Sequence, residues 1–173
     1  IDGADVFTPA IGVEVTADGA TITNGTIKEF NVGIKYNLAS NGTVSNMTLA
    51  NNSQAIILEG TGSHGNTKIV SNIIENNTLD VGNGIVLITY NNTLVAYNVI
   101  KNNKISISTN TVNFSNFSFN NITATDLGIN LGNSGNNTIN FNNISGTTRA
   151  IKVGGTTNPA HVSSYNIISD NNI

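Results

Sequence analysis

One apolar spacing repeats through almost the whole chain. Apolar residues recur in three columns, separated by about ten, then five, then seven residues, so that the period is 22. Neither an α-helix nor an ordinary sandwich uses this spacing, whereas periods of this size are typical of solenoids. The first column holds Val13, Ile34, Ile56, Ile85, Ile107, Ile129 and Ile151. The second holds Ile1, Ile22, Val44, Ile69, Val95, Phe117, Ile139 and Val162, and the third holds Val6, Ile27, Leu49, Ile74, Ile100, Ile122, Ile144 and Ile167.

The local sequence around each column predicts how a coil closes. Column one follows the pattern Gly/Ala-Ile-x-Val/Leu, so alternation turns the first and third apolar residues inward and the middle one outward. Five residues between columns two and three are too few for a hairpin, so the strand must bend there. An asparagine lies two residues before column three at Asn72, Asn98, Asn120 and Asn142. Asparagine tolerates the left-handed backbone of such a bend, and stacked amides form a ladder.

The chain therefore predicts a single all-β domain over residues 1–173. We expect a right-handed parallel β-helix of about seven coils, each with three short strands, because parallel crossover connections are right-handed. Residues 1–11 form a partial first coil, and residues 55–83 form an enlarged coil seven residues longer than its neighbours. Seven strands about 4.8 Å apart give a rod about 35 Å long.

Composition excludes several functions. Only 10% of residues are charged and the net charge is −3, which argues against a nucleic-acid partner because such proteins present a basic face. No apolar run is long enough to span a membrane. The chain has 33 asparagines, and such an asparagine-rich composition is typical of disordered tracts. The ordered apolar columns argue against disorder. Because the sequence begins inside the repeat, we expect a mature or excised piece.

Several stretches resemble a known superfamily. Residues 22–27 (Ile-Thr-Asn-Gly-Thr-Ile), 128–131 (Gly-Ile-Asn-Leu) and 136–144 (Asn-Asn-Thr-Ile-Asn-Phe-Asn-Asn-Ile) are similar to repeats of the pectate-lyase-like superfamily. Within it, the chain most resembles NosD-like and archaeal adhesin-like surface proteins. The resemblance covers essentially the whole chain and implies a right-handed parallel β-helix. It leaves the function open, because lyases, hydrolases, adhesins and stalks share this fold.

An enzymatic site is not indicated by the outward residues of column one. The lyases and galacturonases of the superfamily imply clustered acids beside a base or Ca²⁺, but no two acids are neighbours in this column. Glu14 and Lys35 lie one coil apart, and we expect an exposed ion pair between them. Gly62-Ser63-His64-Gly65 and Arg149-Ala150-Ile151-Lys152 loosely resemble galacturonase motifs, without the paired aspartates. We therefore predict no catalytic residue, no metal site and no cofactor.

The enlarged coil is the candidate ligand site. Three extra residues precede Ile69 and four precede Ile85, and both insertions flank the same column-one strand. Long loops on a rigid scaffold commonly carry binding sites. The alternative is a solvated bulge with stray charges. A metal site formed by His64 with Glu59 or Asp80 would have too few ligands. The candidate residues are Ile57, Glu59, His64, Glu75, Asp80 and Val86.

Two further groups of residues have competing interpretations. Asn41, Asn91 and Asn136 lie in Asn-x-Ser/Thr sequons at expected turns and are candidates for glycosylation, although an Asn- and Thr-rich repeat creates sequons by composition alone. The other group is Phe114, Phe117, Phe119 and Phe141. We expect most of these to stack in the core, and an aromatic sugar platform is the alternative.

These observations favour a non-catalytic extracellular or cell-surface module with a structural or adhesive role. An uncapped rod exposes strand edges, so a segment of a longer stalk, or a subunit that self-associates into a filament or surface layer, is expected. The absence of cysteine permits an extracellular setting. The alternative is a carbohydrate-binding or polysaccharide-cleaving domain centred on the enlarged coil. A carbohydrate or another cell-surface molecule is the expected partner.

Overall fold

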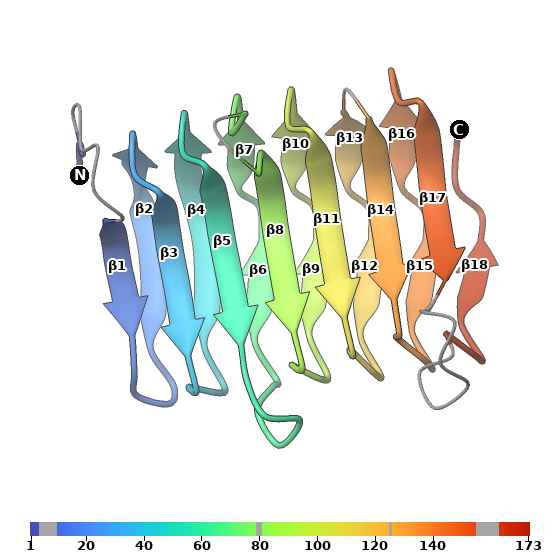
Figure 1. Cartoon of the computed structure of the whole chain (residues 1–173), viewed down its shortest axis with the longest axis horizontal. Coiled ribbons are helices and arrows are strands. Elements are labelled where there is room, and N and C mark those ends of the chain that lie inside the picture. The colour runs from blue at the N-terminus through green and yellow to red at the C-terminus, as the bar shows by residue number, and fades with distance from the viewer. Residues whose placement is uncertain (4–9, 79–80, 125, 155–162) are drawn as a thin grey trace.

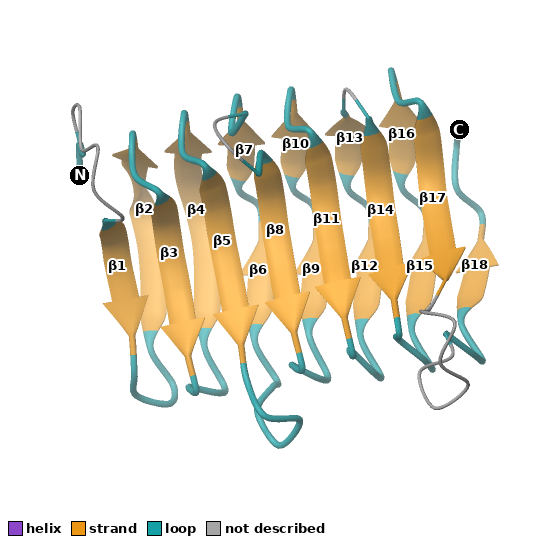
Figure 2. Cartoon of the chain, viewed as in Figure 1, coloured by secondary structure: helices purple, strands orange, loops and turns teal. Residues whose placement is uncertain are grey.

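The protein folds into two parallel β-sheets that enclose one apolar core (Figures 1 and 2). The computed structural model describes the chain except for residues 4–9, 79–80, 125 and 155–162. The front sheet contains β1 (Ile11–Val15), β3 (Val32–Asn37), β5 (Gln54–Glu59), β8 (Asn83–Ile88), β11 (Ile105–Asn110), β14 (Leu127–Gly132) and β17 (Arg149–Gly154), in that order.

The back sheet carries columns two and three. Its first strands are long and cover both columns: β2 (Thr21–Lys28) and β4 (Thr43–Ala50). In later coils each long strand is split by a corner into β6 (Lys68–Val70) and β7 (Ile73–Glu75), β9 (Leu94–Ala96) and β10 (Val99–Lys101), β12 (Asn116–Ser118) and β13 (Asn121–Thr123), and β15 (Thr138–Asn140) and β16 (Asn143–Ser145). The last strand is β18 (Ile167–Ser169), which pairs with β15. In Figure 1 the chain runs down the front, up the back and advances toward the C-terminus, which is a right-handed coil.

The strand registers confirm the three apolar columns. In column one Ile34, Ile56 and Ile85 are direct neighbours, and the pairing continues through Ile107 and Ile129. All five side chains are fully buried. Column two is paired from Ile22 to Ile139, and column three from Ile27 to Ile144. The three columns therefore form one continuous core along the rod.

The expected columns fail at the two ends of the chain. Asp2 bridges Lys28, which places Ile1 beside Ile27 in column three rather than in column two. Ile168, and not Val162, pairs with Ile139 and completes column two. The last coil is therefore longer than the 22-residue period predicts, and Ile167 is an outward residue with 60% of its surface exposed. Val6 and Val162 lie outside the described residues.

The small residue before column one also faces the core. A β-carbon added at Gly33 would lie 2.7 Å from Ala55 O and 3.1 Å from Leu49 Cδ2, and one added at Gly84 would lie 2.6 Å from Ser106 O and 3.3 Å from Ile100 Cγ2. The side-chain contacts are with column three and the closer ones are with carbonyls of the next coil, so this position admits only small residues. Ser106 occupies the same position on β11. Its hydroxyl is buried and has no hydrogen-bond partner.

Replacing Ser106 with alanine is expected to raise the free energy of unfolding by about 1 kcal/mol, because a buried hydroxyl without a partner loses its hydration without compensation. Alanine is already present at this position in two other coils, as Ala55 and Ala150. Urea denaturation measures the change. Ser108→Ala, on the same strand but outward and half-buried, should change stability by less than about 0.5 kcal/mol. An unchanged or lower midpoint for Ser106→Ala would contradict this account.

The predicted asparagine ladder runs along the corner of the back sheet. The side-chain amide nitrogen of Asn72 donates to Asn98 Oδ1 at 3.0 Å, Asn98 donates to Asn120, and Asn120 donates to Asn142. Asn142 then donates to Asn171 in the last coil. Each of these amides also donates to a backbone carbonyl of the preceding coil, as Asn98 does to Ile69. The ladder therefore satisfies buried backbone groups that the corner leaves without strand partners.

Two features of the asparagine corners were not predicted from the sequence. A second ladder, formed by Asn52, Asn77 and Asn103, stacks in the turn that leads from column three to the front sheet. The left-handed residue at the first corner is the one before the ladder asparagine: Ser71, Tyr97, Phe119 and Phe141 have φ between 55° and 58°. The expectation that Asn72 and its equivalents take the left-handed conformation is therefore wrong. Asn24 and Asn46 have this conformation in the first two coils.

Two buried tyrosines close the lower end of the core in the early coils. Tyr36 donates its hydroxyl hydrogen to the carbonyl of Ala20 at 2.8 Å, and the hydroxyl of Tyr90 lies 2.6 Å from Thr67 Oγ1. Burial raises the pKa of Tyr36 to about 12, with a smaller contribution from the charge on Tyr90. Burial also raises the pKa of Tyr90.

The Tyr36 pKa predicts a loss of stability at high pH. The phenol of the unfolded chain ionises near pH 10 and that of the folded chain near pH 12, so the folded state keeps its proton longer. The stabilisation is complete below pH 10 and is lost as the pH rises toward 12. Its size is roughly 2 to 3 kcal/mol. Between pH 9 and pH 11.5 the urea midpoint should fall less in Tyr36→Phe than in the wild type. Equal pH dependence in both proteins would contradict the assignment.

None of the described elements is a helix long and apolar enough to cross a membrane.

Candidate functional site

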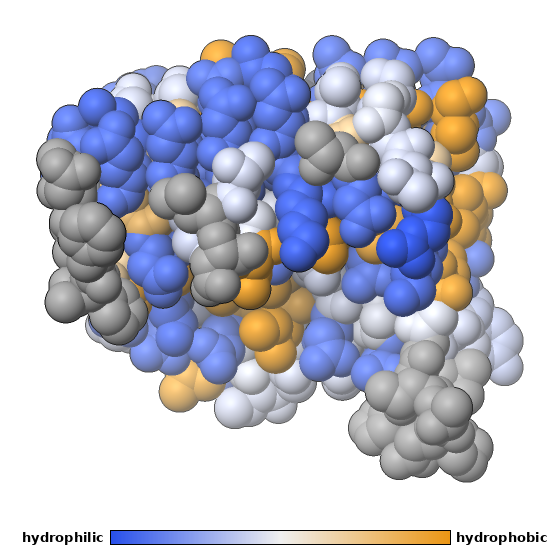
Figure 3. All heavy atoms as spheres, turned by 45° about the horizontal axis from the view of Figure 1, so that its top comes forward, coloured by the Kyte–Doolittle hydropathy of each residue, from blue (hydrophilic) through white to orange (hydrophobic). Residues whose placement is uncertain are grey.

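The outer face of the front sheet carries an apolar cluster beside the enlarged coil. Ile57 on β5 and Val86 on β8 are direct cross-strand neighbours and both point away from the core. They pack with Val32 and Ile88 into a cluster separate from the core. Figure 3 shows apolar side chains gathered over the middle of this sheet among polar ones. Ile57 and Val86 therefore form a small apolar shelf on this face, although only 8% of each is exposed.

Glu59 and His64 lie at the lower edge of this shelf. Glu59 ends β5 and makes an ion pair with Lys35, with Nζ and Oε2 2.9 Å apart. The pair replaces the expected contact between Lys35 and Glu14, whose carboxylate instead accepts a hydrogen bond from the amide of Asn37 at 3.0 Å. His64 lies in the loop over residues 60–67, and its Nδ1 is 3.2 Å from the backbone nitrogen of Thr61. His64 is half-buried and held by its own loop.

Glu75 lies far from this group. It ends β7 in the back sheet, and its carboxylate is 2.8 Å from Lys101 Nζ. The loop after β5 extends below the sheets, whereas the connection from β7 to β8 lies at their upper edge (Figure 1). The two insertions do not flank one front strand as expected: the first leaves the lower end of β5, and the second leads into the upper end of β8. The structure brings Ile57, Val86 and Glu59 together and separates them from Glu75. Asp80 lies outside the described residues.

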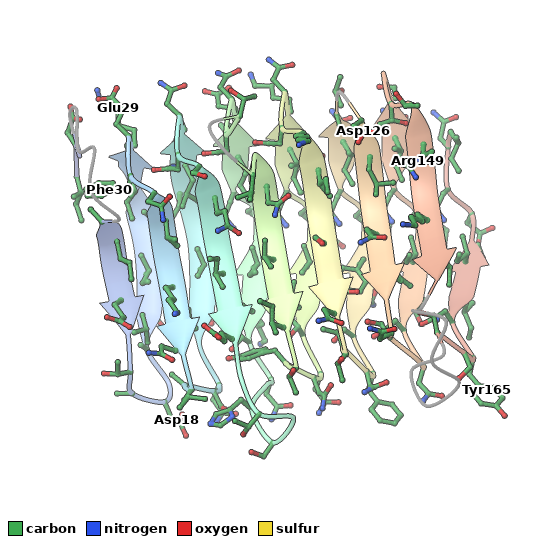
Figure 4. The ribbon with its side chains drawn as sticks, in the orientation of Figure 1. Asp18, Glu29, Phe30, Asp126, Arg149 and Tyr165 are labelled. Atoms are coloured by element: carbon green, nitrogen blue, oxygen red, sulfur yellow. The ribbon has the colours of Figure 1, made fainter. Side chains whose placement is uncertain are left out.

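Other described carboxylates also form ion pairs with lysine or arginine side chains. Besides the two pairs above, Asp126 lies 3.6 Å from Arg149 at the upper edge of the front sheet (Figure 4), and Lys28 contacts both Asp2 and Glu29. The hydrogen bond and charge of Asp2 raise the pKa of Lys28. Glycoside hydrolysis instead uses two carboxyl groups placed about 5 to 9.5 Å apart on either side of a bond. The described carboxylates named here are engaged in ion pairs at the surface.

The three glycosylation candidates differ in accessibility. Asn41 and Asn136 are exposed, and both have positive φ at the same lower corner of the coil. Asn91 is half-buried. Its amide nitrogen donates to the carbonyl of Gly62 at 2.7 Å, and its Oδ1 accepts from the backbone nitrogen of Asn113 at 2.8 Å. Glycosylation would place a sugar on the Asn91 amide nitrogen, which is half-buried beside Gly62, so the exposed Asn41 and Asn136 are better candidates.

Three of the four phenylalanines do not lie in the core, where alternation placed them. Phe117 is fully buried in column two, but Phe114, Phe119 and Phe141 are 63%, 46% and 49% exposed. The expectation of core stacking is wrong for these three because each occupies a left-handed corner position, where the side chain leaves the inward-outward alternation. Tyr97, in the same corner position as Phe119, is 60% exposed.

Three of the exposed rings form an aromatic ladder. The ring centroids of Tyr97 and Phe119 are 5.0 Å apart with planes 3° from parallel, and those of Phe119 and Phe141 are 5.1 Å apart with planes 10° from parallel. These distances match the spacing of neighbouring strands, so each coil contributes one ring. Sequence reasoning missed this ladder. The available signal was an aromatic residue directly before the ladder asparagine in three successive coils.

A bulky residue with a left-handed backbone carries a cost of about 1 to 2 kcal/mol. Exposed aromatic rings also lose the free energy that burial would provide. Three successive coils accept both costs at one corner, where the first two coils use asparagine. Folding alone therefore does not account for this aromatic ladder on the described surface.

The described residues do not fit a metal site. They contain no group of three His, Cys, Asp or Glu side chains that could hold an ion. The sole methionine, Met47, is buried against the core, and the Nδ1 atom of His64 is engaged by Thr61. The full sequence contains no cysteine, and His161 lies outside the described residues. Transition metals prefer thiolate, thioether and imidazole ligands, which the described residues do not bring together.

Comparison with known proteins identifies a family for nearly the whole chain. The family model described as "Periplasmic copper-binding protein (NosD)" matches residues 5–173. A search of curated proteins found no match. The matched range covers every described strand, so the whole β-helix lies within the part of the chain that matches the family. The copper in the family's description has no counterpart among the described side chains of this chain.

Proposed function

Because the chain belongs to the NosD family, whose description places it in the periplasm, we propose that it is a non-catalytic structural and adhesive module of the cell exterior. In this proposal it is a segment of a surface stalk, or a subunit of a filament or surface layer. One observation carries the structural part: the core columns and the amide ladder continue from coil to coil without interruption. Such stacking gives a rigid rod whose length is set by coil number.

The adhesive part is supported by the exposed surface. Charged side chains are few, several of them are engaged in ion pairs, and the aromatic ladder exposes apolar area along one corner. Exposed apolar patches on a folded protein commonly mark interaction sites. A rigid rod that presents such a patch is suited to holding a partner at a distance from the cell.

The test compares binding with cleavage. The purified chain is incubated with a glycan array and, separately, with polygalacturonate under conditions that reveal new unsaturated or reducing ends. We expect binding to at least one surface glycan or to intact cells, without cleavage. Cleavage that disappears in Glu75→Gln or Asp80→Asn would overturn the non-catalytic assignment. Absence of binding to both glycans and cells would remove the adhesive part.

A second candidate is carbohydrate binding at the enlarged coil. The apolar cluster of Ile57 and Val86, with the Lys35–Glu59 ion pair at its edge, is the observation that favours it. Sugar sites commonly combine an apolar surface with a few polar groups that fix orientation. Ile57→Ser and Glu59→Gln would weaken glycan binding if this face is the site. Binding unaffected by either variant would exclude it.

A further inference from the structure

The corner that carries the aromatic ladder has a gap one coil before the first ring. The corner column is defined by the left-handed residues Asn24, Asn46, Ser71, Tyr97, Phe119, Phe141 and Asp170. Strand pairing places Ser71 directly between Asn46 and Tyr97: Val70 pairs with Ser45 on one side and with Ala96 on the other. The backbone nitrogen of Ser71 donates to the carbonyl of Ala96 at 3.2 Å, which fixes this register at the corner.

The gap leaves one face of Tyr97 without a partner ring. Phe119 stacks on one face of Tyr97 with near-parallel planes, so the opposite face turns toward the coil of Ser71. Serine is too short to cover a phenol ring, and Tyr97 remains 60% exposed. The next side chain in the column, Asn46, is exposed and lies two strands from Tyr97, or roughly 10 Å along the rod. We call the position over Ser71, between Asn46 and Tyr97, the slot, because it is where the next ring of the column would lie.

The chemistry around this slot is mixed. Val70 and Ile73 are the outward neighbours of Ser71, and Ile73 is 43% exposed. By register Ser71 lies between Tyr97 and Asn46, so the corner column offers a hydroxyl and then an amide next to the ring. A flat ring with apolar CH groups on its face and hydroxyls on its rim satisfies all of these groups. A purely aromatic ring would stack on Tyr97 but leave the hydroxyl and the amide without partners.

We propose that the slot formed by Asn46, Ser71 and Tyr97 binds one pyranose ring of a neutral polysaccharide, which stacks on the open face of Tyr97 as the next member of the ladder. The site deepens the adhesive role proposed above and rests on it. It is separate from the shelf of Ile57 and Val86, which lies on the front sheet. Phe119 and Phe141 hold the Tyr97 ring in its plane, because each ring stacks on the next.

The proposal explains why the ladder stops at Tyr97. The ring faces inside the ladder are occupied by one another, so a sugar cannot lie on them. Only a terminal face is available for stacking, and at the other end the neighbour of Phe141 is the carboxylate of Asp170. The end at Ser71 instead offers a neutral hydroxyl and a neighbouring amide, which suit an uncharged hydroxylated ring.

The test uses the whole chain with cellohexaose, mannohexaose and chitohexaose as probes. Isothermal titration measures affinity, and amide chemical shifts of Asn46 and Ser71 report on location. We expect at least one probe to bind and to shift both signals. Tyr97→Ala should weaken that binding about tenfold, in line with the contribution of one aromatic stack. Phe114→Ala, at an exposed left-handed position on another corner, should leave the affinity unchanged.

Filling the slot provides the decisive variant. Ser71→Phe extends the ladder by one ring and should abolish binding without lowering the urea midpoint. Binding that survives in both Ser71→Phe and Tyr97→Ala would overturn the slot and leave the adhesive role intact. Failure of all three probes, or tighter binding of benzyl alcohol than of the sugars at the same signals, would also overturn the pyranose assignment. Glycan-array binding by the wild type distinguishes these failures from failure of the adhesive role itself.

Discussion

Replacing Asn98 with alanine is expected to lower the free energy of unfolding by about 3 to 5 kcal/mol. The Asn98 side chain makes four hydrogen bonds in the buried corner. Its Oδ1 accepts from the backbone and side-chain nitrogens of Asn72, and its amide donates to Asn120 Oδ1 and to the carbonyl of Ile69. Alanine leaves several of these groups without partners and without water. Urea or thermal denaturation followed by circular dichroism measures the loss.

The matched control is Asn121→Ala. Asn121 lies on the next coil, is exposed, and shares its Oδ1 with the amide of Asn143 at 3.1 Å. Its removal should cost less than about 0.5 kcal/mol, because water replaces the lost contact. Similar losses in the two variants would show that the ladder contributes nothing beyond ordinary surface hydrogen bonds, and the proposed basis of rod rigidity would be wrong.

The second large effect is expected for Phe117→Ala, which should cost about 3 to 5 kcal/mol. Phe117 is fully buried in column two between Val95 and Ile139. Its truncation opens a cavity that the two flanking coils cannot close, because both are held in register by strand pairing. Equilibrium denaturation measures the change, and a filled or collapsed cavity would appear as a loss below about 2 kcal/mol.

Phe119 offers the comparison for Phe117. It lies two residues away, but its ring is exposed and its backbone is left-handed. Phe119→Asn removes two stacking contacts, worth about 0.5 to 1.5 kcal/mol each. It also relieves part of the backbone strain, because asparagine tolerates this conformation. The two effects oppose each other, so we expect a net change below about 2 kcal/mol. A larger loss than in Phe117→Ala would contradict the division into core and surface rings.

The fold could be predicted because its strongest determinant is periodic in the sequence. A column position repeats with the same residue class in each coil, and one error, such as the placement of Val162, leaves the other coils correct. The Asn72 to Asn142 ladder was predictable for the same reason. The errors fall where the period breaks. At the C-terminal coil the insertion displaces columns two and three, and Ile168 takes the place expected for Val162.

The candidate site was less predictable because it depends on which edge each loop leaves from. The first insertion leaves the lower end of β5 and the second leads into the upper end of β8, which separates Glu75 from Glu59. The exposed rings escaped prediction for a different reason. Inward and outward alternation holds within a strand, but Tyr97, Phe119 and Phe141 occupy corners, where a positive φ redirects the side chain. A corner must be located before alternation can be applied across it.

The amide ladder gives the rod an electrical direction. In each contact from Asn72 to Asn171 the amide nitrogen donates toward the C-terminal coil, and the oxygen accepts from the N-terminal side. The second ladder, Asn52 to Asn103, has the same sense. Amide dipoles aligned head to tail add, as peptide dipoles do in a helix, whereas strand dipoles largely cancel. Parallel rods packed side by side would therefore repel weakly, and rods in opposite orientation would attract.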